Sequence, residues 1–175
     1  KENYSITKAA AASLWVYDFF RHSNLKKNNY IFGSTNAKDY LSNNYINITI
    51  KDLSSKLSST TNQYCNELIK KIDGKKFDIV EIHNRPLVFN TLKNKLNSKF
   101  IIYFHNDPLS MKGSKSARER IDLLNKVEKI IFVSEWVQKR FFIDLDQRLI
   151  NKTEVVYPSI HKQNKLLKKE KKIVF

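Results

Sequence analysis

The sequence predicts an α/β fold, a mostly parallel sheet with helices on both of its faces. Short runs that are almost continuously apolar are typical of strands covered on both sides. Amphipathic runs of helical length alternate with them, and the connections are short. Because parallel neighbours must be joined by crossovers that cover the sheet, this alternation favours a doubly wound arrangement.

The first half of the chain carries the weaker patterns. Residues 7–22 are expected to form an amphipathic helix, because apolar residues recur there at helical spacing. Short apolar runs at 30–32 and 45–50 suggest strands. Residues 60–73 are expected to form a second helix, which ends where Gly74 can adopt the left-handed conformation of a helix cap.

The second half shows the alternation of strands and helices more clearly. Strands are expected, in chain order, at 77–82, 100–104, 129–133 and 154–157. Helices are expected after the first three of these strands, at 87–96, 115–127 and 135–142. Ser134 has the position and the side chain of an N-cap for the last of these helices.

Two of the expected strands are followed directly by a histidine. The first is followed by His83-Asn84-Arg85-Pro86 and the second by His105-Asn106-Asp107-Pro108. Ligands of open parallel sheets bind beyond the carboxyl ends of the strands, so both histidines are expected to face one crevice. A single histidine there is more often a hydrogen-bonded loop residue. For the pair, a functional and a structural interpretation stay equally open.

Other chemistries have weaker support in the sequence. Cys65 is the only cysteine, so no internal disulfide or thiolate cluster can form, and a reducing, cytoplasmic compartment fits. His83 and His105 lack a third nitrogen or sulfur ligand, and Asp107 alone would leave a metal site incomplete. Ser134 lacks the glycines of a nucleophile elbow. No glycine-rich phosphate loop is present.

The net charge of +15 is compatible with several partners. It suits nucleic acid, an anionic membrane surface or phosphorylated substrates, and it equally suits a solvated, lysine-rich surface. Nucleic acid is not expected, because most aromatic residues fall in strands and on apolar helix faces, where they are expected to be core. No apolar run reaches the roughly 18–20 residues that span a bilayer.

Four segments carry motifs in a specific order. Residues 78–86, 103–108, 129–136 and 155–160 read DIVEIHNRP, YFHNDP, KIIFVSEW and VVYPSI. In this order they resemble the amino-terminal domain of the group 1 (family 4) retaining glycosyltransferases of the GT-B fold. The resemblance implies a Rossmann-like, acceptor-binding domain over residues 1–171, with its first strand missing. It implies that residues 172–175 begin a second, donor-binding domain.

The resemblance also implies an activity. Enzymes of this family move a sugar from a nucleotide sugar to a glycan or lipid-linked acceptor with retention, without a metal ion or other cofactor. The expected role is in the synthesis of a bacterial surface polysaccharide or lipopolysaccharide, in the cytoplasm, with peripheral binding to the inner membrane face left open. Without the donor-binding domain, the isolated chain is expected to be inactive.

The resemblance implies roles for particular residues. His105 matches a histidine that reaches the transferred sugar, as a hydrogen-bond partner or electrostatic aid and not as a general base. The residues implied in acceptor binding are His83, Asn84, Arg85, Asn106, Asp107 and Arg118. For Arg118, an ion pair with Asp122 is an equal alternative.

Donor binding is implied for Ala9, Ala10 and Ser134. The two alanines stand where the family usually has glycines, which let the backbone approach a diphosphate. Three alternatives stay open: the alanines tolerate the turn, donor binding is altered, or this stretch is the start of a helix. A degenerate enzyme and a non-catalytic basic module that binds anionic glycan or nucleic acid are the alternative functions.

Overall fold

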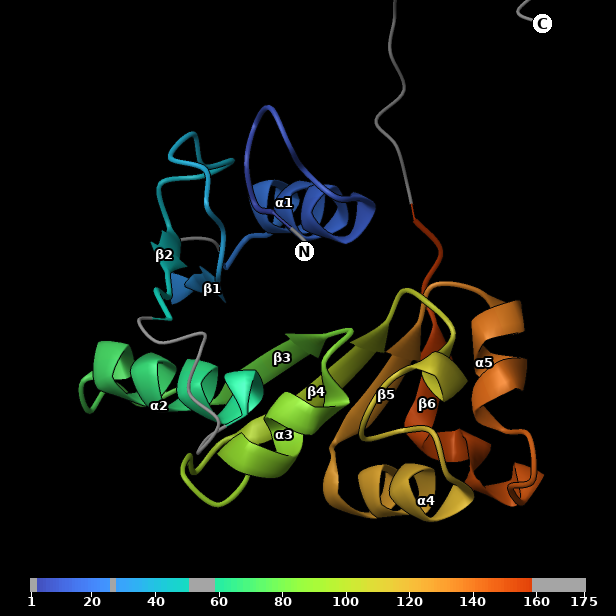
Figure 1. The fold of residues 1–175 in the computed structure, drawn as a ribbon. Helices are drawn as coiled ribbons and strands as arrows, with labels where there is room; N and C mark the ends of the chain where they lie inside the picture. The colour runs from blue at the N-terminus through green and yellow to red at the C-terminus, as the bar shows by residue number, and fades with distance from the viewer. Residues whose placement is uncertain (1–2, 26–27, 51–58, 159–175) are drawn as a thin grey trace, which may run out of the picture.

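The computed structural model describes residues 3–25, 28–50 and 59–158. Within these ranges the chain is an α/β fold with parallel strands in two sheets, as the sequence predicts (Figure 1). The arrangement is consistent with a Rossmann-like doubly wound domain. The expected domain boundary between residues 171 and 172 lies outside the described residues.

The described helices and strands match the expected ones, with shifted ends. The helices are α1 (Ala11–His22), α2 (Thr60–Ile72), α3 (Pro86–Leu92), α4 (Ala117–Lys126) and α5 (Glu135–Phe141). The strands are β1 (Ile31–Gly33), β2 (Tyr45–Asn47), β3 (Ile79–His83), β4 (Lys99–Phe104), β5 (Lys129–Phe132) and β6 (Thr153–Val155). Short 3₁₀ turns lie at Pro108–Ser110 and Gln147–Lys152.

The first helix begins later than its apolar spacing predicts, because Asp39 binds the segment before it. The carboxylate of Asp39 accepts hydrogen bonds from the backbone N and the hydroxyl of Thr7, at 2.9 and 2.8 Å, and from the hydroxyl of Ser5. These bonds lower the pKa of Asp39 to about 2. Among the described residues, this segment forms isolated bridges from Asn3 to Ala9 and from Ser5 to Tyr40.

The larger sheet has the strand order β3-β4-β5-β6, and all of its neighbours are parallel. The backbone pleat sends alternate residues of each strand to opposite faces. One row across the sheet pairs Ile82, Ile102 and Ile130. The next row, on the other face, pairs His83, Tyr103, Ile131 and Glu154.

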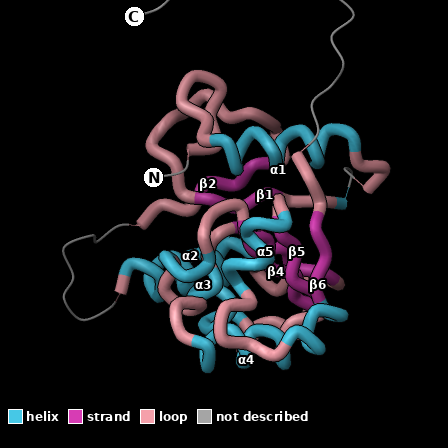
Figure 2. Tube along the Cα trace, turned by 90° about the vertical axis from the view of Figure 1, so that its right-hand side faces the viewer, coloured by secondary structure: helices cyan, strands magenta, loops and turns pink. Residues whose placement is uncertain are grey.

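The hydrophobic core lies on the face of the isoleucine row. Helices α2 to α5 pack apolar side chains against it, and the fully buried ones include Phe89, Leu92, Leu123, Leu124 and Phe141. In both views α1 and α4 lie at opposite ends of the molecule (Figures 1 and 2). The row that begins with His83 therefore faces away from the core, and α1 packs against its end.

A long loop joins β4 to α4 and passes very close to the start of α3. Gly113 in this loop has a φ of +94°, and a Cβ atom there would lie 2.9 Å from the backbone N of Leu87. Only glycine combines this backbone conformation with so close an approach. The loop is thereby held against the element that follows His83.

We expect Gly113→Ala to lower the free energy of unfolding by about 3 kcal/mol, because it adds backbone strain and a clash with the α3 backbone. Gly74→Ala is the matched control, since Gly74 also has a positive φ, of +73°, but no atom lies within 4 Å of its added Cβ. That variant should lose only about 1 kcal/mol. Urea unfolding of both variants tests this, and equal losses would contradict the close approach.

Candidate active site

His83, the last residue of β3, and His105, which follows β4, are in direct contact. Nδ1 of His83 lies 2.9 Å from Nε2 of His105, a hydrogen bond between the imidazole rings. The contact follows from the parallel pairing of β3 with β4, which places His83 opposite Tyr103, two residues before His105. The structure thus brings both imidazoles together at one edge of the sheet, and the crevice that they were expected to face stays a prediction.

Aromatic side chains surround this imidazole pair. The ring of Tyr103 stacks on that of His83, with centroids 4.5 Å apart and an angle of 15° between the planes. Trp15 of α1 contacts all three rings, with centroid distances of 5.7 Å to His83, 5.2 Å to Tyr103 and 5.1 Å to His105. Sequence reasoning assigned Trp15 only to an apolar helix stripe, because nothing local distinguishes it from a core residue.

Asn84 holds the ends of the two strands together. Its side-chain Oδ1 accepts a 2.8 Å hydrogen bond from the backbone N of His105, and its own backbone N donates to the carbonyl of Tyr103 at 2.9 Å. The residue is only 2% exposed, and its φ of 53° is left-handed, a conformation that asparagine tolerates better than most residues. Asn84 therefore has a positioning role, and its contact with an acceptor stays a prediction.

Glu81 adds a carboxylate that the sequence-based site did not include. Its Oε1 accepts a hydrogen bond from the hydroxyl of Tyr103 at 3.3 Å, and its Oε2 lies 3.8 Å from Nε2 of His83. The strand period could have revealed it, because residues two apart on a strand share a face. Burial, and to a smaller extent the charge of Glu81, raises the pKa of the Tyr103 phenol. The hydroxyl therefore stays protonated and donates a hydrogen bond to Glu81.

The imidazole of His105 is neutral over most of the pH range. Burial, and to a smaller extent the neighbouring His83, lowers its pKa from 6.5 to about 4. Among the described residues, the only hydrogen-bond partner of its ring is His83. A neutral imidazole can donate one hydrogen bond and accept another, but it carries no charge to place near a substrate.

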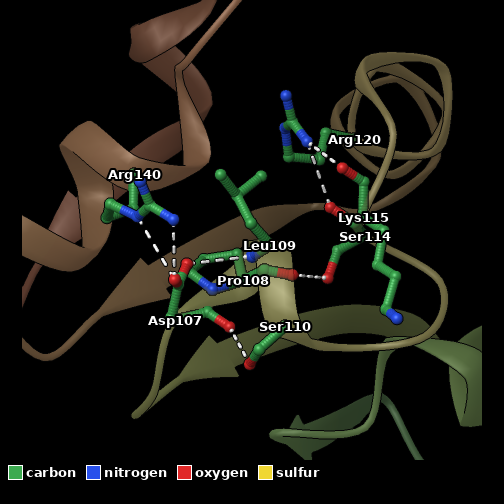
Figure 3. A network of polar contacts seen from close by, with 8 residues as sticks. All are labelled: Asp107, Pro108, Leu109, Ser110, Ser114, Lys115, Arg120 and Arg140. Carbon is green, nitrogen blue, oxygen red and sulfur yellow. Dashed lines mark hydrogen bonds and ion pairs between the residues drawn. The ribbon is translucent and has the colours of Figure 1, made fainter.

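Asp107 is engaged in holding the loop after β4 (Figure 3). Arg140 of α5 donates to its Oδ2 from Nε and Nη2, at 3.2 and 2.9 Å, and the backbone N of Leu109 donates to Oδ1. The bonds from Arg140 lower the pKa of this carboxyl. Asp107 thus has a structural role in addition to any contact with an acceptor.

Arg120 anchors the other end of this loop and is only 2% exposed. Its guanidinium donates to the carbonyls of Ser114 and Lys115, at 3.2 and 2.7 Å (Figure 3). It also donates to the carbonyl of Ile143 at 2.6 Å. Its Nε is the one buried side-chain nitrogen or oxygen that has no partner within the described ranges. The buried cation fixes the loop to α4 and to the segment after α5.

The other residues assigned to the acceptor fall into two groups. Arg85 and Asn106 are exposed and adjoin the imidazole pair in the chain, and Arg85 donates to the carbonyl of Asn84 at 3.0 Å. They remain available for the contact that the sequence predicts.

Arg118 belongs to the second group. It is exposed in the first turn of α4, the helix that lies at the other end of the molecule from α1 (Figures 1 and 2). Asp122, the alternative partner, forms ion pairs with Lys93 and Lys126. The structure does not bring Arg118 to the imidazole pair.

The residues predicted to bind the donor lie at or just before the first turn of a helix. Ala10 is the N-cap of α1 with an extended φ of −82°, and Ala9 pairs with Asn3 in a single bridge. Of the three alternatives, the start of a helix therefore describes this stretch. Ser134 caps α5 as predicted, because its hydroxyl accepts a hydrogen bond from the backbone N of Val137 at 3.3 Å.

No family model matches the chain, and no curated protein matches it. In the part of the chain that the structure describes, no helix has the length and apolar character needed to cross a membrane. Over the same residues, no three or more histidine, cysteine, aspartate or glutamate side chains are grouped as a metal site. The imidazole pair at the sheet edge is thus the basis for a functional proposal.

The neutral state of His105 predicts a pH dependence of stability. The unfolded chain binds this proton near pH 6.5 and the folded chain only near pH 4. The unfolded state therefore binds more protons between these values, so stability is fully present above pH 6.5 and falls as the pH drops toward 4. Urea unfolding from pH 7 to pH 4 should show this loss.

His105→Gln should reduce this loss, because the neutral amide takes up no proton. His22→Gln, at the exposed end of α1, is the control that should retain it. An NMR titration of the wild-type imidazoles adds a direct measurement. A midpoint for His105 near 6.5 would contradict the burial of its ring.

Proposed function

We propose that this chain is the acceptor-side lobe of a retaining glycosyltransferase, which moves a sugar from a nucleotide sugar to a glycan or lipid-linked acceptor. The observation that carries the proposal is the direct contact of His83 with His105 at the carboxyl ends of two parallel strands. Open α/β sheets bind their ligands at this edge. The ordered motifs of the sequence give the class of reaction.

The neutral imidazole of His105 suits a role in hydrogen bonding to a sugar hydroxyl. In a retaining transfer of this class, the departing phosphate takes the proton of the acceptor, so no side chain on this lobe has to act as a base. The lobe then contributes position and electrostatic stabilisation. Trp15 and Tyr103 support this role, because their rings fix the imidazole pair from two sides.

The start of α1 supports a donor contact near Ala9 and Ala10. Ala10 provides no side-chain cap, and the first turn contains no acidic residue. The first backbone N–H groups of a helix carry partial positive charge and favour an anion such as a diphosphate. Since the same helix carries Trp15, a donor held there would lie on the element that covers the histidines.

The acceptor would contact Arg85 and Asn106, the exposed polar residues beside the imidazole pair. We propose a bacterial surface polysaccharide or lipopolysaccharide precursor as the acceptor. The net charge of +15 suits an enzyme that works in the cytoplasm against the anionic inner face of the membrane. Nucleotide-sugar binding would rest mainly on a second lobe, so the assay requires the full-length protein.

The test is a transfer assay of the full-length protein with a panel of nucleotide sugars. His105→Ala should lower kcat by about 100-fold or more, the loss expected when a preorganised hydrogen-bond partner is removed. Its melting temperature should stay close to that of the wild type. The matched control is His22→Ala, which removes an exposed histidine from the end of α1 and should leave the rate unchanged.

Two results would count against the proposal. One is the absence of transfer, hydrolysis and binding with every nucleotide sugar of the panel. The other is a His105→Ala variant that turns over at the wild-type rate.

A further inference from the structure

Glu81, His83 and His105 lie in a line on one face of the sheet. The carboxylate of Glu81 lies 3.8 Å from Nε2 of His83, and Nδ1 of His83 is bonded to Nε2 of His105 at 2.9 Å. The first distance is too long for a hydrogen bond, but it is short enough for the charge of Glu81 to act on the ring of His83. Each imidazole thus uses one nitrogen within the pair, and His83 uses its other nitrogen toward the carboxylate.

The positions of the hydrogens follow from this geometry. A neutral imidazole carries one N–H and one acceptor nitrogen, and a hydrogen bond between two rings needs one of each. The negative charge of Glu81 favours the tautomer of His83 that has its hydrogen on Nε2. Nδ1 of His83 is then the acceptor, so Nε2 of His105 must donate, and Nδ1 of His105 is left with a lone pair.

We propose that Glu81, acting through His83, holds His105 in its Nε2–H tautomer, so that Nδ1 of His105 accepts a hydrogen bond from a hydroxyl group of the substrate. The identification of that hydroxyl as one of a sugar rests on the proposed function. The tautomer itself does not. A substrate that presents an acceptor atom at this position, such as a methyl ether, is disfavoured because two lone pairs would meet.

Tyr103 supports this arrangement on both sides. Its hydroxyl donates to Oε1 of Glu81 at 3.3 Å, which holds the carboxylate near His83. Its ring stacks on the imidazole of His83 at 4.5 Å, which opposes rotation of that ring. A half-turn of that ring about its Cβ–Cγ bond would put Cδ2 in the place of Nδ1 and Cε1 in the place of Nε2, and would break the order of donors and acceptors.

The test is long-range ¹H–¹⁵N NMR of the ¹⁵N-labelled chain at pH 8, above the ordinary pKa of histidine. The chain contains four histidines, so replacing them one at a time assigns the signals. We expect His105 to show a protonated Nε2 and an unprotonated Nδ1. A wild-type spectrum with the hydrogen of His105 on Nδ1 would overturn the proposal without any variant.

Glu81→Gln tests the role of the carboxylate. The amide has no charge, and its NH₂ can donate to His83, so the ratio of the two His105 tautomers should fall by about tenfold. The control is Glu128→Gln, which removes a carboxylate paired with Lys99 away from the histidines. An unchanged ratio in Glu81→Gln, with the fold intact by circular dichroism, would overturn the proposal.

These outcomes are separate from those of the proposed function. The expected tautomer, together with no activity toward any nucleotide sugar, would support this inference and overturn the sugar-transfer proposal. Transfer activity together with the opposite tautomer of His105 would support the sugar-transfer proposal and overturn this inference. Glu81 is thus tested as a positioning residue by a spectroscopic readout that a purely structural role would not move.

Discussion

The hydrogen bond from the backbone N of His105 to Oδ1 of Asn84 is the constraint on which the candidate site depends. Asn84 turns the chain out of β3 in a left-handed conformation, and its buried side chain reaches across to the end of β4. The bond therefore sets the distance between the carboxyl ends of β3 and β4, where the two histidines lie. The 2.9 Å contact between the rings follows from that separation.

The asymmetry of the sheet gives this edge its chemistry. Helices α2 to α5 bury one face of the sheet, so the alternation of each strand presents its other residues away from the core. On β3 these residues are Glu81 and His83, and on β4 they include Tyr103. Side chains that project from paired strands are placed more precisely than side chains on loops. The order of carboxylate, phenol and imidazoles is thus set by strand register.

Local pattern accounts for what the sequence could predict. The strands, the Ser134 cap and the meeting of His83 with His105 all follow from period, spacing and the shared edge of parallel strands. The cover by Trp15 and the ion pair of Arg140 with Asp107 join segments far apart in the chain. An isolated arginine or tryptophan in a sequence has many possible partners, so packing alone selects these. The late start of α1 has the same cause, since Asp39 overrides helix spacing from a distance.

The order of the groups explains why two histidines serve better here than one. A carboxylate in direct contact with His105 would stabilise the imidazolium and raise its pKa, as suits a general base. With His83 between them, Glu81 can set which nitrogen of His105 carries the hydrogen, while its negative charge stays away from the His105 ring. His105 is half-buried and its pKa is lowered to about 4, so the ring stays neutral at pH 7. In the proposed tautomer, the lone pair of Nδ1 then keeps a fixed direction. In the proposed transfer, a group of this kind would recognise a hydroxyl of the substrate, and the departing phosphate would take the proton of the reaction.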